Sequence, residues 1–179
     1  MPNQPQGILS FTVIGDEAVK AGMAALLASV QDLTPFWRDV FAPKYFGMVQ
    51  DLFATSGTPR GEGGRFIGGP WAKLSPRYRI WKTANYPGLP ILTREGRLRN
   101  SLAWNGSNVG PEGIFEAHPM FAVAGTSVPY GKFHQWGTSK MPARPFLPPP
   151  DPAVFAPLLH AWLVKAHDTG SASAPSAGS

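Results

Sequence analysis

The sequence predicts an α+β fold, in which a small antiparallel β-sheet packs against N-terminal and C-terminal helices, with long loops. Apolar residues recur every three or four positions near both ends of the chain, which is the period of an amphipathic helix. Short β-branched and aromatic runs bounded by glycine lie between them and indicate strands. Glycine and proline number 20 each and gather between these runs, so many loops are expected on a folded body.

The N-terminal third is predicted to contain one strand followed by two helices. Residues 8–14 have strand character, and Asp16 is expected to cap the first helix. The apolar positions of that helix share one face and are Val19, Met23, Leu26, Leu27, Val30 and Leu33. Thr34 and Pro35 have the pattern of a helix cap and first turn, so an aromatic-rich helix should follow, kinked or split at Pro43.

The middle of the chain is predicted to form a loop, a short helix and a β meander. Residues 57–69 are rich in glycine and are expected to be flexible. No strand precedes them and they lack the GK[ST] signature, so they do not fit a phosphate-binding loop. Ser75 and Pro76 should open a short basic helix. Antiparallel strands are predicted near 101–104, at 113–117 and at 121–124.

The C-terminal part is predicted to be one helix and a flexible tail. Asp151 and Pro152 have the pattern of a helix start, and apolar residues with one-face spacing follow. Small residues dominate from 168 to 179, which predicts a flexible tail. Everything before the tail is expected to form a single domain over 1–167.

Residues 130–147 carry the densest group of distinctive side chains. An aromatic-rich turn ends at Gly137 and contains Tyr130, Phe133, His134 and Trp136. Two prolines, Pro142 and Pro145, then flank Arg144 and should hold the backbone extended, because each disfavours helix for the residue before it. Such a segment can place the Arg144 side chain rigidly. The alternative is a buried turn followed by an edge strand.

The charge is unevenly distributed. The net charge is +5, and nine basic residues between Arg60 and Arg99 face only Glu62 and Glu95, a local balance of +7. The rest of the chain therefore carries about −2. A basic segment of this kind suits nucleic acid, an acidic partner protein or an ordinary solvated face, and no recognisable nucleic-acid module surrounds it.

The sequence shows no catalytic or metal-binding pattern. It has no cysteine, which excludes disulfides and thiolate metal sites, and no run of apolar residues long enough for a membrane span. Its four histidines lack metal-ligand spacing: His160 and His167 are two helical turns apart. There is no GxSxG motif and no pair of carboxylates in an apolar setting. We therefore expect no enzyme, no metal and no cofactor.

Taken in order, the motifs of residues 50–165 resemble the phage virion-morphogenesis family, which completes the tails of Mu-like tailed phages. The pattern begins with a helical part that ends in an aromatic residue, Phe53, followed by Trp71-x-x-Leu74 and the short basic helix with Lys82. It continues with Ile91-Leu92, Gly96, Leu98 and Ser101, then with Gly125-Thr126, then with Tyr130, His134-Gln135 and Gly137, then with Pro142 to Leu147, PARPFL, and ends with a C-terminal helix. The insertion at 57–69, the region at 107–119 and the C-terminal tail are longer than the family pattern.

The resemblance implies a structural, non-enzymatic protein of the virion neck or tail end that assembles in the host cytoplasm. Related neck proteins form rings, commonly hexamers, around the DNA channel. The implied partners are further copies of the chain, the head–tail connector and the tail-tube proteins, with genomic DNA close by in the lumen and no membrane.

A ring needs heterologous contacts, in which one patch of a subunit meets a different patch of the next. The side chains predicted to make these contacts are Arg144, Phe146, Trp136, His134, Trp71 and Arg97. Arg144 should pair with a carboxylate in its own or the next subunit, because its planar fork suits that role. On this view Arg144→Ala would leave a folded subunit that assembles poorly. For the tryptophans, the alternative is ordinary core packing.

Two other functions compete with the ring subunit. A protein that contacts DNA through the basic segment at 60–99 would bind with an affinity that falls steeply with salt. An enzyme of lysis or head processing would use His134 as its best candidate residue, although the catalytic patterns named above are absent.

Overall fold

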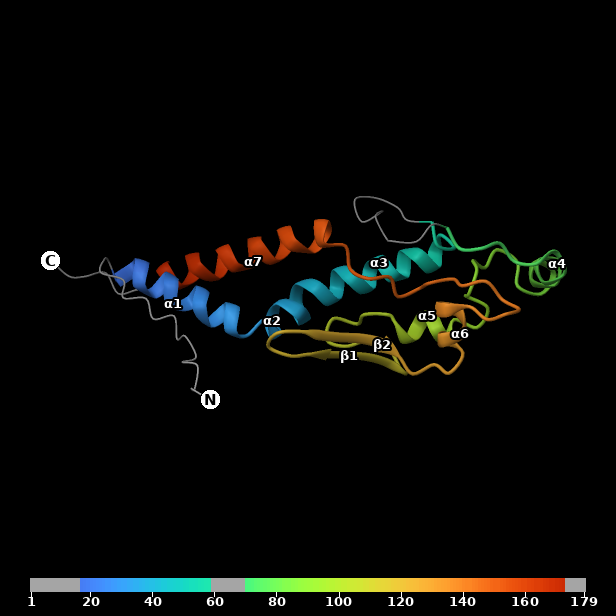
Figure 1. The fold of residues 1–179 in the computed structure, drawn as a ribbon, viewed down its shortest axis with the longest axis horizontal. Helices are drawn as coiled ribbons and strands as arrows, with labels where there is room; N and C mark the ends of the chain where they lie inside the picture. The colour runs from blue at the N-terminus through green and yellow to red at the C-terminus, as the bar shows by residue number, and fades with distance from the viewer. Residues whose placement is uncertain (1–16, 59–69, 173–179) are drawn as a thin grey trace, which may run out of the picture. The chain divides into compact units, whose positions relative to one another are not determined.

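The computed structural model describes residues 17–58 and 70–172, and its α+β class confirms the prediction (Figure 1). The predicted strand at 8–14, the cap Asp16 and nearly all of the glycine-rich loop lie outside the described residues. The described residues divide into two compact units, residues 17–30 with 163–172 and residues 31–58 with 70–162. The single domain over 1–167 stays a prediction.

The first unit contains most of α1 (Glu17–Gln31) and the last part of α7 (Pro152–Ala172). The predicted first helix is therefore confirmed. Its predicted apolar face is only partly covered, since Val19 and Leu27 are each 48% exposed. The predicted tail is wrong over 168–172, because α7 runs on to Ala172 instead of ending near Asp168.

In the second unit, one continuous helical segment replaces the predicted kinked or split helix. It consists of α2 (Thr34–Phe36), the π-helical turn η1 (Trp37–Phe41) and α3 (Ala42–Ala54). Pro43 has no N–H and would clash with the carbonyl four residues earlier. The wider π turn directly before Pro43, in which the Ala42 amide donates to the Trp37 carbonyl, accommodates it without breaking the helix.

The start of this segment corrects a predicted cap. The Asp32 carboxylate, not Thr34, accepts the first free amide, that of Thr34, at 2.9 Å. Hydrogen bonding to the Thr34 side chain, with a smaller contribution from this amide, holds the pKa of Asp32 below its usual value. Pro35 still lies in the first turn as predicted.

The core of the second unit is aromatic. Phe46 of α3 stacks on Trp104 and meets Phe115 edge to face, and Phe53 packs against Trp71 and Phe146. At the other end of the helix, the core is continued by Phe41 and Phe155.

Two short helices follow the gap in the described chain. The Ser75 hydroxyl caps α4 (Pro76–Asn85) by accepting from the Tyr78 amide at 3.4 Å, so the predicted cap is confirmed and the helix is longer than predicted. The second short helix is α5 (Arg97–Ser101). Gly96 precedes it with φ of 75°, a left-handed conformation that glycine adopts without strain.

The predicted three-part meander is a two-stranded hairpin. β1 (Gly113–Ala117) pairs antiparallel with β2 (Ala122–Thr126), which lies close to the predicted ranges. The strand predicted near 101–104 is wrong, because α5 occupies Ser101 and only a single bridge, Trp104 to Val109, follows. The hairpin lies alongside α3 (Figure 1), and Phe115 of β1 packs on Phe46 of α3.

A buried pair of hydroxyls fixes α5 against the end of β2. Ser101 is fully buried and donates to the Leu98 carbonyl, and its Oγ lies 2.8 Å from Thr126 Oγ1. Gly113 makes this close approach possible, because a Cβ there would lie 2.0 Å from the Ser101 carbonyl oxygen.

This contact predicts that alanine lowers the stability of the protein at Gly113 and leaves it unchanged at another glycine of the same hairpin. Gly113→Ala should lower the free energy of unfolding by about 1–3 kcal/mol, because the new methyl overpacks against backbone. Gly125→Ala is the matched control, since its Cβ would meet only Ile114 at 3.9 Å. Urea unfolding followed by tryptophan fluorescence measures both, and equal midpoints for the two variants would contradict the packing described.

Candidate assembly interface

Residues 131–148 form a clamp in which side chains hold an extended backbone. α6 (Gly131–Trp136) ends at Gly137, and the chain turns back through a bridge between Thr138 and Met141. The Gln135 amide oxygen accepts from the Phe146 and Leu147 amides at 3.0 and 3.1 Å, and its nitrogen donates to the Leu147 carbonyl at 3.1 Å. One side chain therefore does for this segment what a neighbouring strand does in a sheet.

Gly137 permits the turn back. Its φ of 75° and ψ of −177° lie in a region that only glycine populates readily. A Cβ at this position would lie 2.7 Å from the Ala143 nitrogen. The HQxG and PARPFL motifs are thus two halves of one structure: Gln135 and Gly137 supply the clamp, and residues 142–147 are what it holds.

Arg144 points inward, which corrects its predicted role. It is 5% exposed, and its Nε and Nη2 donate to the carbonyls of Ala72 and Lys73 at 2.8 and 3.1 Å. Its partners are backbone carbonyls of its own chain and not a carboxylate. Burial lowers the pKa of Arg144 from its usual value. Because the guanidinium group is used within the subunit, Arg144 joins its own segment to residues that lie 72 and 71 positions earlier in the chain.

Two further predicted interface residues belong to the core around this clamp. Trp71 is 6% exposed and donates from Nε1 to the Pro145 carbonyl at 2.7 Å. Phe146 is 2% exposed and packs on Phe53. Tyr45 completes the support by donating its hydroxyl to the Pro148 carbonyl at 2.8 Å, and burial raises the pKa of Tyr45 to about 12. The alternative considered for Trp71, core packing, is the one the structure supports.

His134 is half-buried and contacts the ring of Tyr130 edge to face. Burial, with a smaller contribution from the positive charge of Arg144, lowers its pKa below the usual value and favours the neutral ring. Its Nδ1 is buried without a hydrogen-bond partner among the described residues. No described carboxylate forms an ion pair with it, so the orienting group that a catalytic histidine commonly has is not seen.

Arg97 is exposed and forms a two-pronged ion pair with Glu112, at 2.7 and 2.5 Å. The pair raises the pKa of Arg97 and lowers that of Glu112. It links α5 to the residue before β1 in the same chain. Because the Arg97 side chain stays exposed in this pair, it can still take part in an outside contact.

Trp136, like Arg97, is a predicted interface residue that the structure leaves on the surface, and it is 80% exposed. Phe133 lies one helical turn earlier on α6, is also exposed, and carries Lys132 over its ring. The hairpin and α4 present further large apolar side chains to solvent: Ile114, Met120, Phe121 and Val123 on the hairpin, and Tyr78, Ile80 and Trp81 on α4. Sequence periodicity did not single out the hairpin group, because a half-exposed strand and a buried one look alike over five residues.

The described part of the basic segment is less cationic than its composition suggests. Lys82 is buried and donates to the carbonyls of Leu89 and Pro90, and Arg94 pairs with the adjacent Glu95. By contrast, Lys73, Arg77 and Arg79 are exposed and form no ion pair with any described carboxylate.

An open cleft of about 580 Å³ lies along one face of α4, lined by Thr55, Ser56, Lys73, Arg79 and Tyr86 among others. Within residues 17–58 and 70–172, no cluster of three or more acidic or histidine side chains is placed to bind a metal ion. None of the helices over those same ranges is long and apolar enough to cross a membrane. No protein-family model, curated protein or solved structure matches the chain.

The Arg144 contacts reverse the expectation drawn from the sequence. Arg144→Ala should destabilise the subunit itself by about 2 kcal/mol, because it removes a buried guanidinium and its hydrogen bonds to the carbonyls of Ala72 and Lys73. Arg144→Lys should restore only part of the loss, since an ammonium cannot reproduce the fork. Urea unfolding measures both variants beside Lys140→Ala, an exposed control. A wild-type midpoint for Arg144→Ala would show that this contact is not structural.

Proposed function

We propose that this chain is a structural, non-enzymatic subunit of a tailed-phage virion. It acts in tail completion and head–tail joining as one member of a homo-oligomeric ring at the neck. The proposal rests on the ordered motifs that resemble the virion-morphogenesis family, and one structural observation supports it most. Motif residues that lie far apart in the sequence are hydrogen-bonded to one another within the second unit.

These hydrogen bonds connect several of the motifs. Trp71 and Gln135 hold the PARPFL segment, whose Arg144 returns to the backbone beside Trp71. Ser101 of the G-x-L-x-x-S motif meets Thr126 of the Gly-Thr motif. These motif residues therefore support the fold of the second unit. On this proposal, the outer surface is the part of the subunit that contacts its partners.

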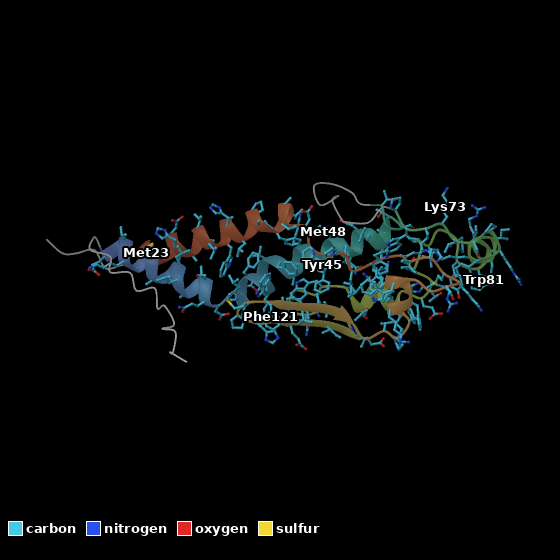
Figure 2. All side chains as sticks on the ribbon, in the orientation of Figure 1. Met23, Tyr45, Met48, Lys73, Trp81 and Phe121 are labelled. Atoms are coloured by element: carbon cyan, nitrogen blue, oxygen red, sulfur yellow. The ribbon has the colours of Figure 1, made fainter. Side chains whose placement is uncertain are left out.

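The outer surface is suited to assembly through unlike patches. Within the second unit, Phe121 lies at the turn of the hairpin and Trp81 lies on α4 at the far end (Figure 2). Both are exposed and both have apolar neighbours. A closed ring needs two different patches on each subunit, one for each neighbour, and large aromatic side chains are common anchors in such contacts.

In the proposed setting, the subunit assembles in the host cytoplasm and becomes part of the neck. Its partners are further copies of itself, in a ring expected to be a hexamer, together with the head–tail connector or the tail-tube proteins. Genomic DNA passes through the lumen.

Electron microscopy of particles made without the chain tests the proposal. In the phage proposed to encode it, disruption of the coding sequence should give filled heads and tails that stay unjoined. Complementation with a gold-labelled copy should place the label at the junction. Complete, infectious particles without the chain, or label elsewhere, would refute the proposed function.

A substitution at Trp136 can distinguish an effect on assembly from an effect on folding. Trp136→Ala should leave the free energy of unfolding within about 0.5 kcal/mol of wild type, because the side chain is largely in solvent. It should nevertheless reduce the yield of joined particles in complementation. Lys140→Ala is the control from the same surface turn. Normal particle yield with Trp136→Ala would remove this residue from the assembly contacts.

A second function, contact with DNA, is favoured by one specific observation. Residues 70–93 contain no Asp or Glu, and Lys73, Arg77 and Arg79 remain exposed and unpaired among the described residues. Tyr78 and Trp81 stack on each other on the same helix. Cations beside exposed aromatic rings are a combination that nucleic-acid-binding surfaces use.

Salt dependence distinguishes this candidate from a purely structural subunit. A DNA contact through α4 predicts that log affinity falls linearly with log salt, and that Arg77→Ala with Arg79→Ala reduces the slope by about 2. Lys165→Ala, on α7, should leave the slope unchanged. Fluorescence anisotropy with a labelled duplex makes the measurement. No binding at low salt would eliminate DNA contact as a function of this surface.

A further inference from the structure

The two edges of the β1–β2 hairpin are open. The Ser127 amide donates to the Glu112 carbonyl and the His118 amide to the Phe121 carbonyl, which fixes which pairs are hydrogen-bonded within the hairpin. Because antiparallel pairs alternate, the N–H and C=O groups of the intervening residues point outward. These residues are Phe115 and Ala117 on β1 and Ala122 and Ala124 on β2. No backbone or side-chain hydrogen bond within the described chain reaches those groups.

Neither edge carries the usual protection against pairing. Natural edge strands are commonly blunted by lysine, proline, a bulge or a covering element. β2 reads AVAGT, without a charge or a proline, and it pairs with β1 in unbroken register. The only charge on β1 is Glu116, whose side chain lies on the outer face beside His118.

Apart from Glu116 and His118, the outer face of the hairpin carries apolar side chains. Ile114 and Val123 are exposed there, and Met120 and Phe121 at the turn are exposed still further. The inner face is occupied, since Phe115 packs on Phe46 and Trp104. The hairpin therefore has a fixed, buried side and two free edges that border an exposed apolar side.

We infer that these two edges pair with each other between copies of the chain, so that β1 of one subunit extends the sheet of the next through its β2. The outward backbone groups of the two edges are complementary, so the partner of each edge is another copy of the chain. When a hairpin is repeated side by side in one direction, β2 of the next copy runs antiparallel to β1. Both edges then present outward groups at every second residue, so donors and acceptors match.

This junction is heterologous, because the β1 edge of one subunit meets the β2 edge of the next, and a joined pair of subunits still has one free edge of each kind. Repetition with rotation closes a ring, as the proposed function requires. The inference rests on that proposed function for its biological setting, but the pairing itself is a property of the chain and can be tested alone.

Mixed single-cysteine variants test the pairing, since the natural chain has no cysteine. One variant is Val123→Cys. The others are Ile114→Cys, Glu116→Cys and His118→Cys on β1, one for each of three neighbouring registers. If the edges repeat the register of the hairpin, Glu116 of one copy lies opposite Val123 of the next in a pair that is not hydrogen-bonded, with Cα atoms about 4.5 Å apart and within disulfide reach.

Equal mixtures of Val123→Cys with each β1 variant are oxidised with glutathione disulfide and separated on non-reducing gels. The expected result is that one β1 variant gives unlike dimers at least about tenfold faster than a control mixture with Ile80→Cys, because pairing raises the local thiol concentration. Ile80 is exposed on α4 and reports random collision.

Two outcomes overturn the edge pairing. One is that no β1 variant exceeds the control rate. The other is that Val123→Cys alone dimerises as fast as any mixture, which would indicate a symmetric contact. Either result would leave the proposed neck function to be tested by electron microscopy of particles made without the chain. Conversely, fast unlike dimers from a chain whose loss leaves particles complete would uphold the pairing and refute the neck function.

Discussion

The second unit depends on how its proline-rich segment satisfies its backbone. Residues 142–150 include five prolines, which donate no hydrogen bonds and cannot join the interior of a sheet. The remaining polar backbone groups still need partners where they are buried. Gln135, Trp71 and Tyr45 provide them from three different parts of the chain. Arg144, from within this segment, donates hydrogen bonds to the carbonyls of Ala72 and Lys73. The fold therefore uses side chains where most folds use a neighbouring strand.

This arrangement determines which residues remain on the surface. Once Trp71, Arg144 and Phe146 are used inside, α6 is held by Gln135 and presents Phe133 and Trp136 to solvent. A similar division applies to the hairpin, whose inner residues pack on α3 while its outer face and edges stay free. Large exposed apolar side chains that no intrachain contact explains are the features that mark interaction sites. The same unit thus separates residues that make the fold from residues available to a neighbour.

Local patterns predicted most helices and the hairpin, because capping, helical period and glycine position act over a few residues. Ser75 capped α4 as predicted, and β1 and β2 lie near their predicted ranges. Long-range contacts could not be predicted in this way. The partner of Arg144 lies more than 70 residues away, and a proline-flanked arginine gives no sign of whether it faces carbonyls or a carboxylate. In the sequence Lys82 counted as a surface charge, yet its side chain is buried and donates to two carbonyls of a nearby turn. The sequence also could not show whether the helix would accommodate Pro43 by a kink or by the π-helical turn that precedes it.

Charge and apolar exposure separate two kinds of contact on this unit. Lys73, Arg77 and Arg79 lie in or near α4, where no carboxylate of residues 70–93 offsets them, so this end favours an acidic partner. Their attraction acts at a distance and weakens with salt. The β1 and β2 edges instead offer hydrogen bonds and apolar side chains, which act only at contact and are far less sensitive to salt. An assembly that uses both would have an encounter step governed by ionic strength and a final interface that is not. Dissociation rates insensitive to salt, combined with association rates that fall with it, are therefore the kinetic signature that this distribution of residues implies.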